Sequence, residues 1–210
     1  MLRVFLMPLG FHEDILLRSM THLRVHRDDV VYVVTCSPLV GAVKRALESL
    51  RALCLRQGFP EPRVLELECR DFYESVRRVK SVISEHKGVE LYFCSGAGLR
   101  ILLHIIEVAL LASRKPFTLH YEPEAEGVDT VTIPSTLYVN ILRKPSEIEE
   151  RVLRLVVESG EITVKEIAIK LEIKEKTVKN TLTRLKNLGL ITKKGKGRVA
   201  ATQIAQVLCG

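Results

Sequence analysis

The chain has 210 residues, of which 47% are hydrophobic and 27% charged, with a formal net charge of +7. This composition is typical of a globular protein with one large domain or two smaller ones, and no apolar run reaches membrane-spanning length. Five cysteines, an odd number without CxxC spacing, indicate neither a zinc site nor a disulfide framework. We therefore expect reduced thiols, a cytoplasmic location, no membrane partner and no bound metal.

Strand and helix patterns alternate over the first 120 residues. Short runs rich in β-branched and aromatic residues predict five strands, at residues 2–7, 29–36, 63–68, 91–94 and 117–122. Amphipathic segments predict four helices between them, over residues 13–25, 39–57, 71–87 and from 99 onward. This repeat predicts an α/β domain with a Rossmann-like, doubly wound parallel sheet of strand order 3-2-1-4-5.

The turns after the first and fourth strands are expected to form one crevice. In this strand order the two strands are neighbours at the topological switch point, where such sheets bind ligands. Each turn contains glycine: the first is Pro8-Leu9-Gly10-Phe11 and the second is Ser95-Gly96-Ala97-Gly98. The helix opened by Leu99 has no acid in its first turn, so its N-terminus and Arg100 favour an anion such as phosphate.

Simpler interpretations of the same residues stay open. A tight strand-to-helix turn occurs in any α/β domain and needs no ligand. His12 and Glu13 could suggest a metal pair, but adjacent residues at a helix start point apart, which favours a solvated cap.

The helix that follows Leu99 is apolar on almost all sides. Its polar residues Arg100, His104 and Glu107 form a single stripe. Packing on one face of a sheet needs only one apolar stripe, so the excess predicts a second buried face. A homodimer contact is the simplest interpretation, and burial by other parts of the same chain is the alternative.

The last third of the chain has a different pattern. We expect an edge strand or hairpin and then the linker Arg143-Lys144-Pro145, which divides the chain into domains 1–144 and 145–210. Capping boxes at Ser146 and Thr163 open two helices, and a third helix spans residues 174–188. Two short strands then flank the basic turn 193–198. This order predicts a winged helix-turn-helix domain.

Basic residues are concentrated in that domain. Residues 174–198 carry nine Lys and Arg and one acid, Glu175, which indicates double-stranded DNA as the partner. The third helix would enter the major groove, and the wing would contact phosphates. The expected DNA-binding residues are Lys174, Lys176, Thr177, Lys179, Asn180, Thr183, Lys194, Lys196 and Arg198. The alternative is a winged helix that contacts proteins and whose lysines are merely solvated.

The whole chain resembles the CARF–winged-helix regulators of archaeal CRISPR loci, the Csa-type transcription factors of antiviral defence. The resemblance lies in PLGFHEDILLR (8–18), CSPLVGAVKRALESLRA (36–52), GAGLRILL (96–103), LLASRKPFTLHY (110–121) and the winged helix. It implies a homodimer that binds cyclic tetra-adenylate with the turns after strands one and four. By position, Leu9-Gly10-Phe11 match the first family motif and residues 96–100 the second. Pro8 and Ala97 depart from the Thr-like and Met-like residues of the family.

These observations predict a homodimeric regulator that binds the promoters of CRISPR-associated genes and is controlled by a cyclic oligoadenylate. The expected ligand-binding residues are Pro8, Leu9, Gly10, Phe11, Ser37, Ser95, Gly96, Ala97, Gly98, Leu99 and Arg100. No Ser/His/Asp or paired-carboxylate arrangement is present, so no catalytic residue is expected. Two alternatives stay open. In a ring nuclease, Ser37 or Ser95 near Arg100 would position a 2′-hydroxyl for attack; an architectural DNA-binding protein would need no ligand.

Overall fold

The computed structural model describes residues 2–125 and 128–209, with the side chain of Lys196 excepted. It divides the chain into two compact units, Met1–Ser135 and Thr136–Gly210, which we describe separately. In the part of the chain that is described, no helix is both long enough and apolar enough to cross a bilayer.

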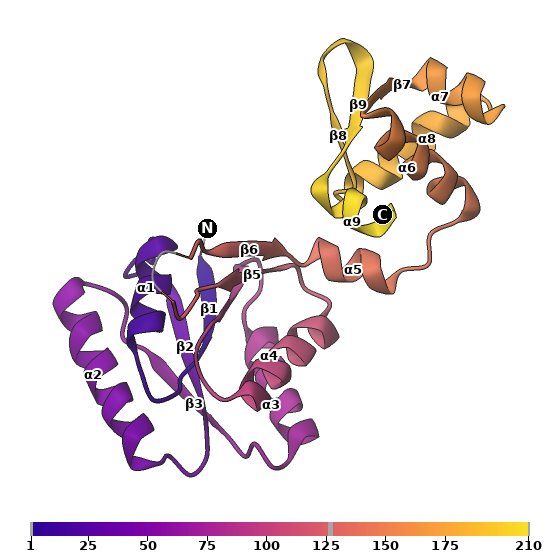
Figure 1. The fold of residues 1–210 in the computed structure, drawn as a ribbon. Helices are drawn as coiled ribbons and strands as arrows, with labels where there is room; N and C mark the ends of the chain where they lie inside the picture. Colours follow the sequence, from indigo (N-terminus) through magenta and orange to yellow (C-terminus); the bar gives the residue numbers. More distant parts are fainter. Residues whose placement is uncertain (1, 126–127, 210) are drawn as a thin grey trace. The chain divides into compact units, whose positions relative to one another are not determined.

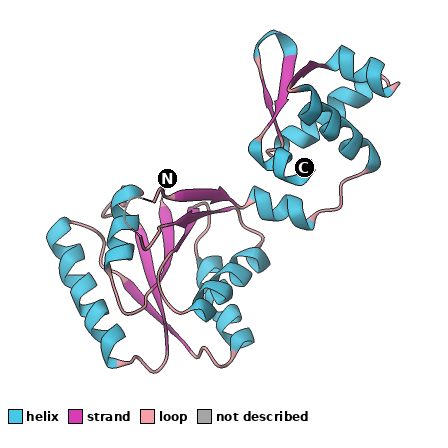
Figure 2. Ribbon diagram, in the orientation of Figure 1, coloured by secondary structure: helices cyan, strands magenta, loops and turns pink. Residues whose placement is uncertain are grey.

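The first unit is a sheet covered by helices on both faces (Figures 1 and 2). Its elements are β1 Arg3–Pro8, α1 Asp14–His22, β2 Val30–Cys36, α2 Gly41–Gln57, β3 Arg63–Leu67, α3 Phe72–Glu85, β4 Glu90–Ser95, α4 Arg100–Ser113, β5 Phe117–Tyr121 and β6 Val131–Pro134. The strand order is β3-β2-β1-β4-β5-β6, parallel except for β6, which pairs antiparallel with β5. The predicted order of the five parallel strands and the Rossmann-like fold class are confirmed.

The central strands are buried on both faces. Phe5, Met7 and Val33 are completely inaccessible, as expected for a parallel sheet that has helices on each side. Figure 1 shows α1 and α2 on one face and α3 and α4 on the other. The turns at the carboxyl ends of β1 and β4 lie at one edge of the sheet, where doubly wound folds bind ligands.

Most of the apolar residues of helix α4 are buried within its own chain. Ile105 and Ile106 are completely inaccessible and belong to the core of the unit. The apolar positions that stay outward are Leu99, Ile101 and Val108, which are 49%, 36% and 40% exposed. Burial by other parts of the same chain therefore accounts for most of the apolar surface of this helix. Only a narrower exposed apolar surface is left that a partner subunit could cover.

The expectation of reduced thiols fails at one pair, because Cys36 and Cys69 form a disulfide. Cys36 is the last residue of β2 and lies opposite Leu67 in the parallel pairing with β3. Cys69 follows two residues later, so the turn brings its sulfur back beside Cys36. The two cysteines are 33 residues apart in the sequence and meet only because β2 and β3 are neighbours in the sheet. Cysteine spacing in the sequence therefore could not predict this disulfide.

The boundary between the units lies before the expected linker. Residues Thr136–Leu142 form helix α5, which belongs to the second unit. The Asn140 side chain donates hydrogen bonds to the backbone oxygens of Thr136 and Leu188, at 2.7 and 2.9 Å, and so fastens α5 to the end of α8. The segment before residue 145 is therefore partly helical.

The second unit is a bundle of helices with a small antiparallel sheet. Its further elements are α6 Glu147–Ser159, β7 Glu161–Thr163, α7 Val164–Leu171, α8 Glu175–Asn187, β8 Ile191–Lys193, β9 Arg198–Ala201 and α9 Gln203–Cys209, with sheet order β7-β9-β8. Both predicted capping boxes are present, at Ser146 and Thr163. The winged helix-turn-helix class is confirmed, and the short strand β7 and helix α9 are added to it.

Candidate ligand crevice and nucleic-acid interface

The two glycine-containing turns of the first unit touch each other through their backbones. A Cβ built on Gly10 would lie 3.1 Å from both the Cα and the N of Gly98. A Cβ on Gly98 would lie 2.9 Å from the Cβ of Pro8, and the residue has a φ of +86°. On the other side, a Cβ on Gly96 would collide with the backbone oxygen of Glu122. Glycine is therefore required at positions 96 and 98, and a side chain at position 10 would make the Gly98 backbone shift by a few tenths of an ångström.

A hollow of about 410 Å³ opens beside these turns. Among the predicted ligand residues, six line it: Leu9, Gly10, Phe11, Ala97, Gly98 and Leu99. Five do not line it: Pro8, Ser37, Ser95, Gly96 and Arg100. Pro8 is buried beneath Gly98, and the backbone oxygen of Ser95 accepts a hydrogen bond from the Glu122 N–H at 2.9 Å. These two residues support the turns from below, outside the lining.

Much of the remaining lining comes from the second strand and helix. Pro38, Val40 and Val43, with Ile15 from α1, make the wall mainly apolar, and Cys36 brings the disulfide to its edge. Phe11 is 58% exposed at the rim. An apolar hollow with an exposed ring at its mouth fits a flat, weakly polar group such as a nucleobase.

His12 and one acid, Glu124, complete the lining, and groups that could attract an anion lie near it. No side chain caps α4, its first turn holds no acid, and Arg100 is exposed at its start. Helix α2 is likewise uncapped and free of acid in its first turn. A guanidinium nitrogen of Arg45 lies 3.6 Å from where a Cβ of Gly41 would be, beside that N-terminus. Arg45 was not among the predicted ligand-binding residues, of which only Ser37 follows β2.

In the second unit, α8 presents a polar surface opposite its core residues. Val178 and Leu185 are buried, whereas Lys179 and Asn180 are exposed. The other predicted contacts on this helix are also accessible: Lys174, Lys176 and Thr183 are exposed and Thr177 is half-buried. Lys179 lies 3.9 Å from Glu175 in an exposed ion pair, which is too weak to hold the ammonium group away from a phosphate.

A basic groove of about 510 Å³ lies between α8 and the wing formed by β8 and β9. Four of the predicted DNA-binding residues line it: Lys179, Thr183, Lys194 and Arg198. Lys186 and Lys193 join them, although neither was among the predicted contacts. No acidic residue contributes to the described lining. The side chain of Lys196 lies outside the described residues.

Comparison with known proteins extends over both units. Residues 3–134 match the family model of the Csa3 CRISPR-associated Rossmann-like domain, and residues 145–203 match that of the penicillinase repressor. The chain is 28% identical over 197 residues to the "CRISPR locus-related putative DNA-binding protein Csa3" of Saccharolobus solfataricus, covering 94% of this chain and 83% of that protein.

Two solved structures resemble nearly the whole chain, each at 10% identity over 99% of it. They are Can2 from Sulfobacillus thermosulfidooxidans in complex with cyclic tetra-adenylate, with a TM-score of 0.45, and protein VC1899 from Vibrio cholerae, with a TM-score of 0.40. This chain spans 61% and 64% of their lengths.

Proposed function

We propose, on the premise that the chain belongs to the Csa3 family of CRISPR-associated Rossmann-like proteins, that it is a homodimeric transcription regulator of CRISPR-associated genes. The C-terminal winged helix binds promoter DNA in this proposal. The Rossmann-like (CARF) unit binds a cyclic oligoadenylate, with cyclic tetra-adenylate as the first candidate. Binding of the ligand changes the affinity of the dimer for DNA.

The basic groove beside α8 is the observation that carries this proposal. Five Lys and Arg residues line one concave surface between a helix and a β-hairpin: Lys179, Lys186, Lys193, Lys194 and Arg198. A winged helix that only contacts proteins has no need of five like charges around one groove, because their mutual repulsion is unfavourable until an anion fills it. A nucleic-acid backbone supplies that anion, and the exposed face of α8 then lies towards base edges.

The crevice supports a cyclic oligoadenylate for three reasons. The apolar wall accepts a base, the uncapped N-termini of α2 and α4 accept phosphates, and Arg45 and Arg100 add positive charge. Because a cyclic oligonucleotide repeats both groups around a ring, two copies of this crevice can hold one ring across a two-fold axis. The proposed ligand residues are the six predicted residues that line the hollow, with Ser37, Gly96, Arg100 and Arg45 outside the lining, whereas Pro8 and Ser95 support the turns.

Control of DNA binding follows from linkage between the two sites. A ligand shifts the equilibrium between two dimer conformations only by the ratio of its affinities for them. The expected effect of the ligand is a change in DNA affinity of between about fivefold and 150-fold, the usual range of allosteric coupling.

The test is a series of DNA-binding isotherms at increasing salt on a CRISPR-associated promoter and on scrambled DNA. Replacing Lys193, Lys194 and Arg198 by Ala should weaken binding to both DNAs and reduce the salt slope by about three units, one for each phosphate that is no longer neutralised. The matched control replaces three basic residues outside the groove, Arg151, Lys165 and Lys170. If the wing variant binds DNA as well as the control does, the groove is a solvated surface and the DNA-binding proposal fails.

A further inference from the structure

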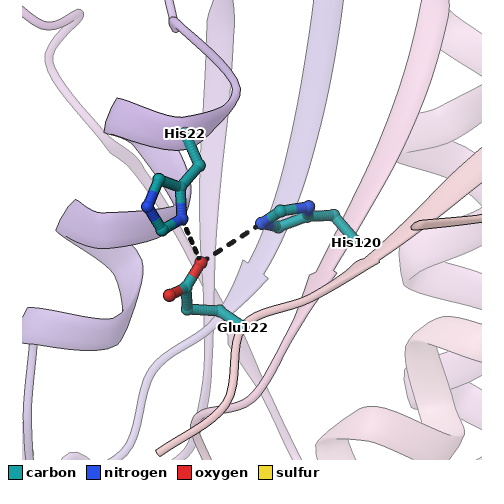
Figure 3. A group of neighbouring side chains, drawn as sticks. All are labelled: His22, His120 and Glu122. Atoms are coloured by element: carbon teal, nitrogen blue, oxygen red, sulfur yellow. Dashed lines mark hydrogen bonds and ion pairs between the residues drawn. The ribbon is translucent and has the colours of Figure 1, made fainter. Parts of the chain in front are cut away.

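Three side chains that the proposed function does not use converge near the end of β5 (Figure 3). His120, on β5, and Glu122, just after β5, are each 2% exposed, and His22 reaches them from the last turn of α1. Both imidazoles point to one carboxylate oxygen: the His22 Nδ1 lies 2.8 Å and the His120 Nε2 3.3 Å from the Glu122 Oε2.

We infer that His22, His120 and Glu122 form a binding site for a divalent transition-metal ion, with Zn²⁺ as the fitting species. One ligand atom from each residue lies within 4.8 Å of the other two. Two imidazole nitrogens and one carboxylate oxygen are a ligand set that zinc accepts in three-ligand sites. Mg²⁺ and Ca²⁺ prefer sets made of oxygen alone, so the imidazoles select against them.

Two of the three donor separations are close to those that the ion requires, and the separation between the two imidazole nitrogens is no more than 4.8 Å. Donor atoms in a tetrahedral zinc site lie about 3.3 Å apart, because each bond is about 2.0–2.1 Å long. The Glu122–His120 separation already has that value, and the Glu122–His22 separation has to widen by about half an ångström. The His22 side chain is 50% exposed at the end of its helix, so it is the ligand free to move and its open side leaves a position for water.

The surrounding groups are compatible with a metal ligand at Glu122 Oε2. The Arg18 Nε lies 3.9 Å from the other carboxylate oxygen, Oε1, and its guanidinium is further held by the Pro123 backbone oxygen at 3.0 Å. Burial lowers the pKa of His120, against an opposing effect of Glu122 and with a smaller lowering by His22.

A metal here would fasten two segments that carry the crevice. His22 ends the helix that starts after the first glycine turn, and the Glu122 backbone oxygen touches Gly96 of the second turn. Joining His22 to Glu122 across 100 residues of sequence would therefore hold α1 against the end of β5. This role predicts stabilisation by the ion whether or not any nucleotide is bound.

The experiment measures zinc binding by the full-length chain after treatment with a chelator. It uses a Cys209→Ser background, because Cys209 is a partly accessible free thiol that could bind zinc by itself. The background protein should bind one Zn²⁺ per chain by elemental analysis. At a Zn²⁺ concentration a hundredfold above the dissociation constant, the thermal midpoint should rise by at least about 3 °C, whereas Mg²⁺ should leave it unchanged.

The variant His22→Ala distinguishes this site from other histidines, because it removes a half-exposed ligand without opening the core. It should lower zinc affinity by at least about tenfold and so reduce the thermal shift at the same Zn²⁺ concentration by about half or more. The control His26→Ala removes a histidine that is 71% exposed and outside the cluster, and it should bind zinc as the background does. Absence of stoichiometric zinc binding, or equal binding by the background and His22→Ala proteins, would overturn the inference.

Discussion

Glycine residues decide how close the two turns of the crevice can come. Gly10 and Gly98 touch backbone to backbone, and Gly96 rests on the backbone of Glu122. Gly98 has a left-handed φ, and a Cβ added to it would press against Pro8. Pro8 cannot move aside easily, because its ring is rigid and it ends a central strand. A side chain at position 98 would therefore be destabilising for two reasons, backbone strain and steric overlap with Pro8.

Gly98→Ala should destabilise the first unit by about 2–4 kcal/mol, of which about 1 comes from the left-handed backbone and the rest from overpacking against Pro8. Gly88→Ala is the matched control, because Gly88 has a φ of +67° but nothing within 4 Å of an added Cβ. Its cost should be about 1 kcal/mol. Urea denaturation of both variants measures the difference, and equal destabilisation would mean that the turns do not pack closely.

Arg100→Ala should weaken cyclic tetra-adenylate binding without affecting the fold, because the side chain is exposed at the start of α4. Removal of one charge-assisted hydrogen bond costs about 1.5–3 kcal/mol per site, or roughly a tenfold to 150-fold rise in the dissociation constant. Calorimetric titration measures it, with Arg114→Ala, an exposed arginine at the other end of the same helix, as the control. Unchanged affinity of the Arg100 variant would remove this residue from the site.

At the scale of the element, α6 depends on a buried acid. Glu149 is 2% exposed and accepts hydrogen bonds from the Ser146 N–H at 2.9 Å and the Arg143 guanidinium at 2.6 Å. Burial by itself would raise the pKa of Glu149, but these bonds outweigh it and the pKa is lowered from its usual range. A lowered native pKa stabilises the fold above the unfolded value near 4.5, and that stabilisation is lost as the pH falls through the native value.

Glu149→Gln should therefore destabilise the second unit by about 1–3 kcal/mol at neutral pH, because the charge-assisted bond to Arg143 is removed. The difference from the wild-type protein should shrink as the pH falls below about 4.5. Glu150→Gln is the control: its exposed i,i+4 pair with Arg154 is worth only about 0.3–0.5 kcal/mol. Thermal denaturation across pH 3–8 measures both, and a pH-independent difference would contradict the assignment.

At the scale of the whole molecule, the outward apolar stripe of α4 is the surface left to explain. Ile101 and Val108 lie seven residues apart, on one side of the helix, and are 36% and 40% exposed. Leu99, the residue before the helix, is also exposed and lines the hollow. A two-fold contact through this stripe would place two crevices side by side, which the proposed ring-shaped ligand requires.

The double variant Ile101→Glu, Val108→Glu should convert the proposed dimer to a monomer with an intact fold, since both side chains are outward and charge is strongly disfavoured in an interface core. Leu55→Glu provides the control, because Leu55 is an 84% exposed apolar residue on α2. Light scattering at micromolar concentration measures the mass. A monomeric wild-type protein, with or without cyclic tetra-adenylate, would refute the dimer.

The sequence by itself determined those features of the fold that depend on residues close together in the chain or on the right-handedness of crossover connections. Alternating and continuous apolar runs predicted the five parallel strands, and the right-handed crossover rule predicted their order. The capping boxes at Ser146 and Thr163 marked two helix starts, because each needs only side chains three residues apart. The glycine turns followed from the same topology, although their use as a ligand site stays a prediction.

Only the tertiary structure decided the contacts between residues far apart in the chain. The disulfide of Cys36 and Cys69, the attachment of α5 through Asn140 to Leu188 and the meeting of His22 with Glu122 span 33, 48 and 100 residues. Local patterns specify which face of an element is apolar but not which partner covers it, so the sequence could not tell that Ile105 and Ile106 belong to the core. The physical reason is that such contacts depend on how packed elements are placed in space, a property that belongs to the whole fold.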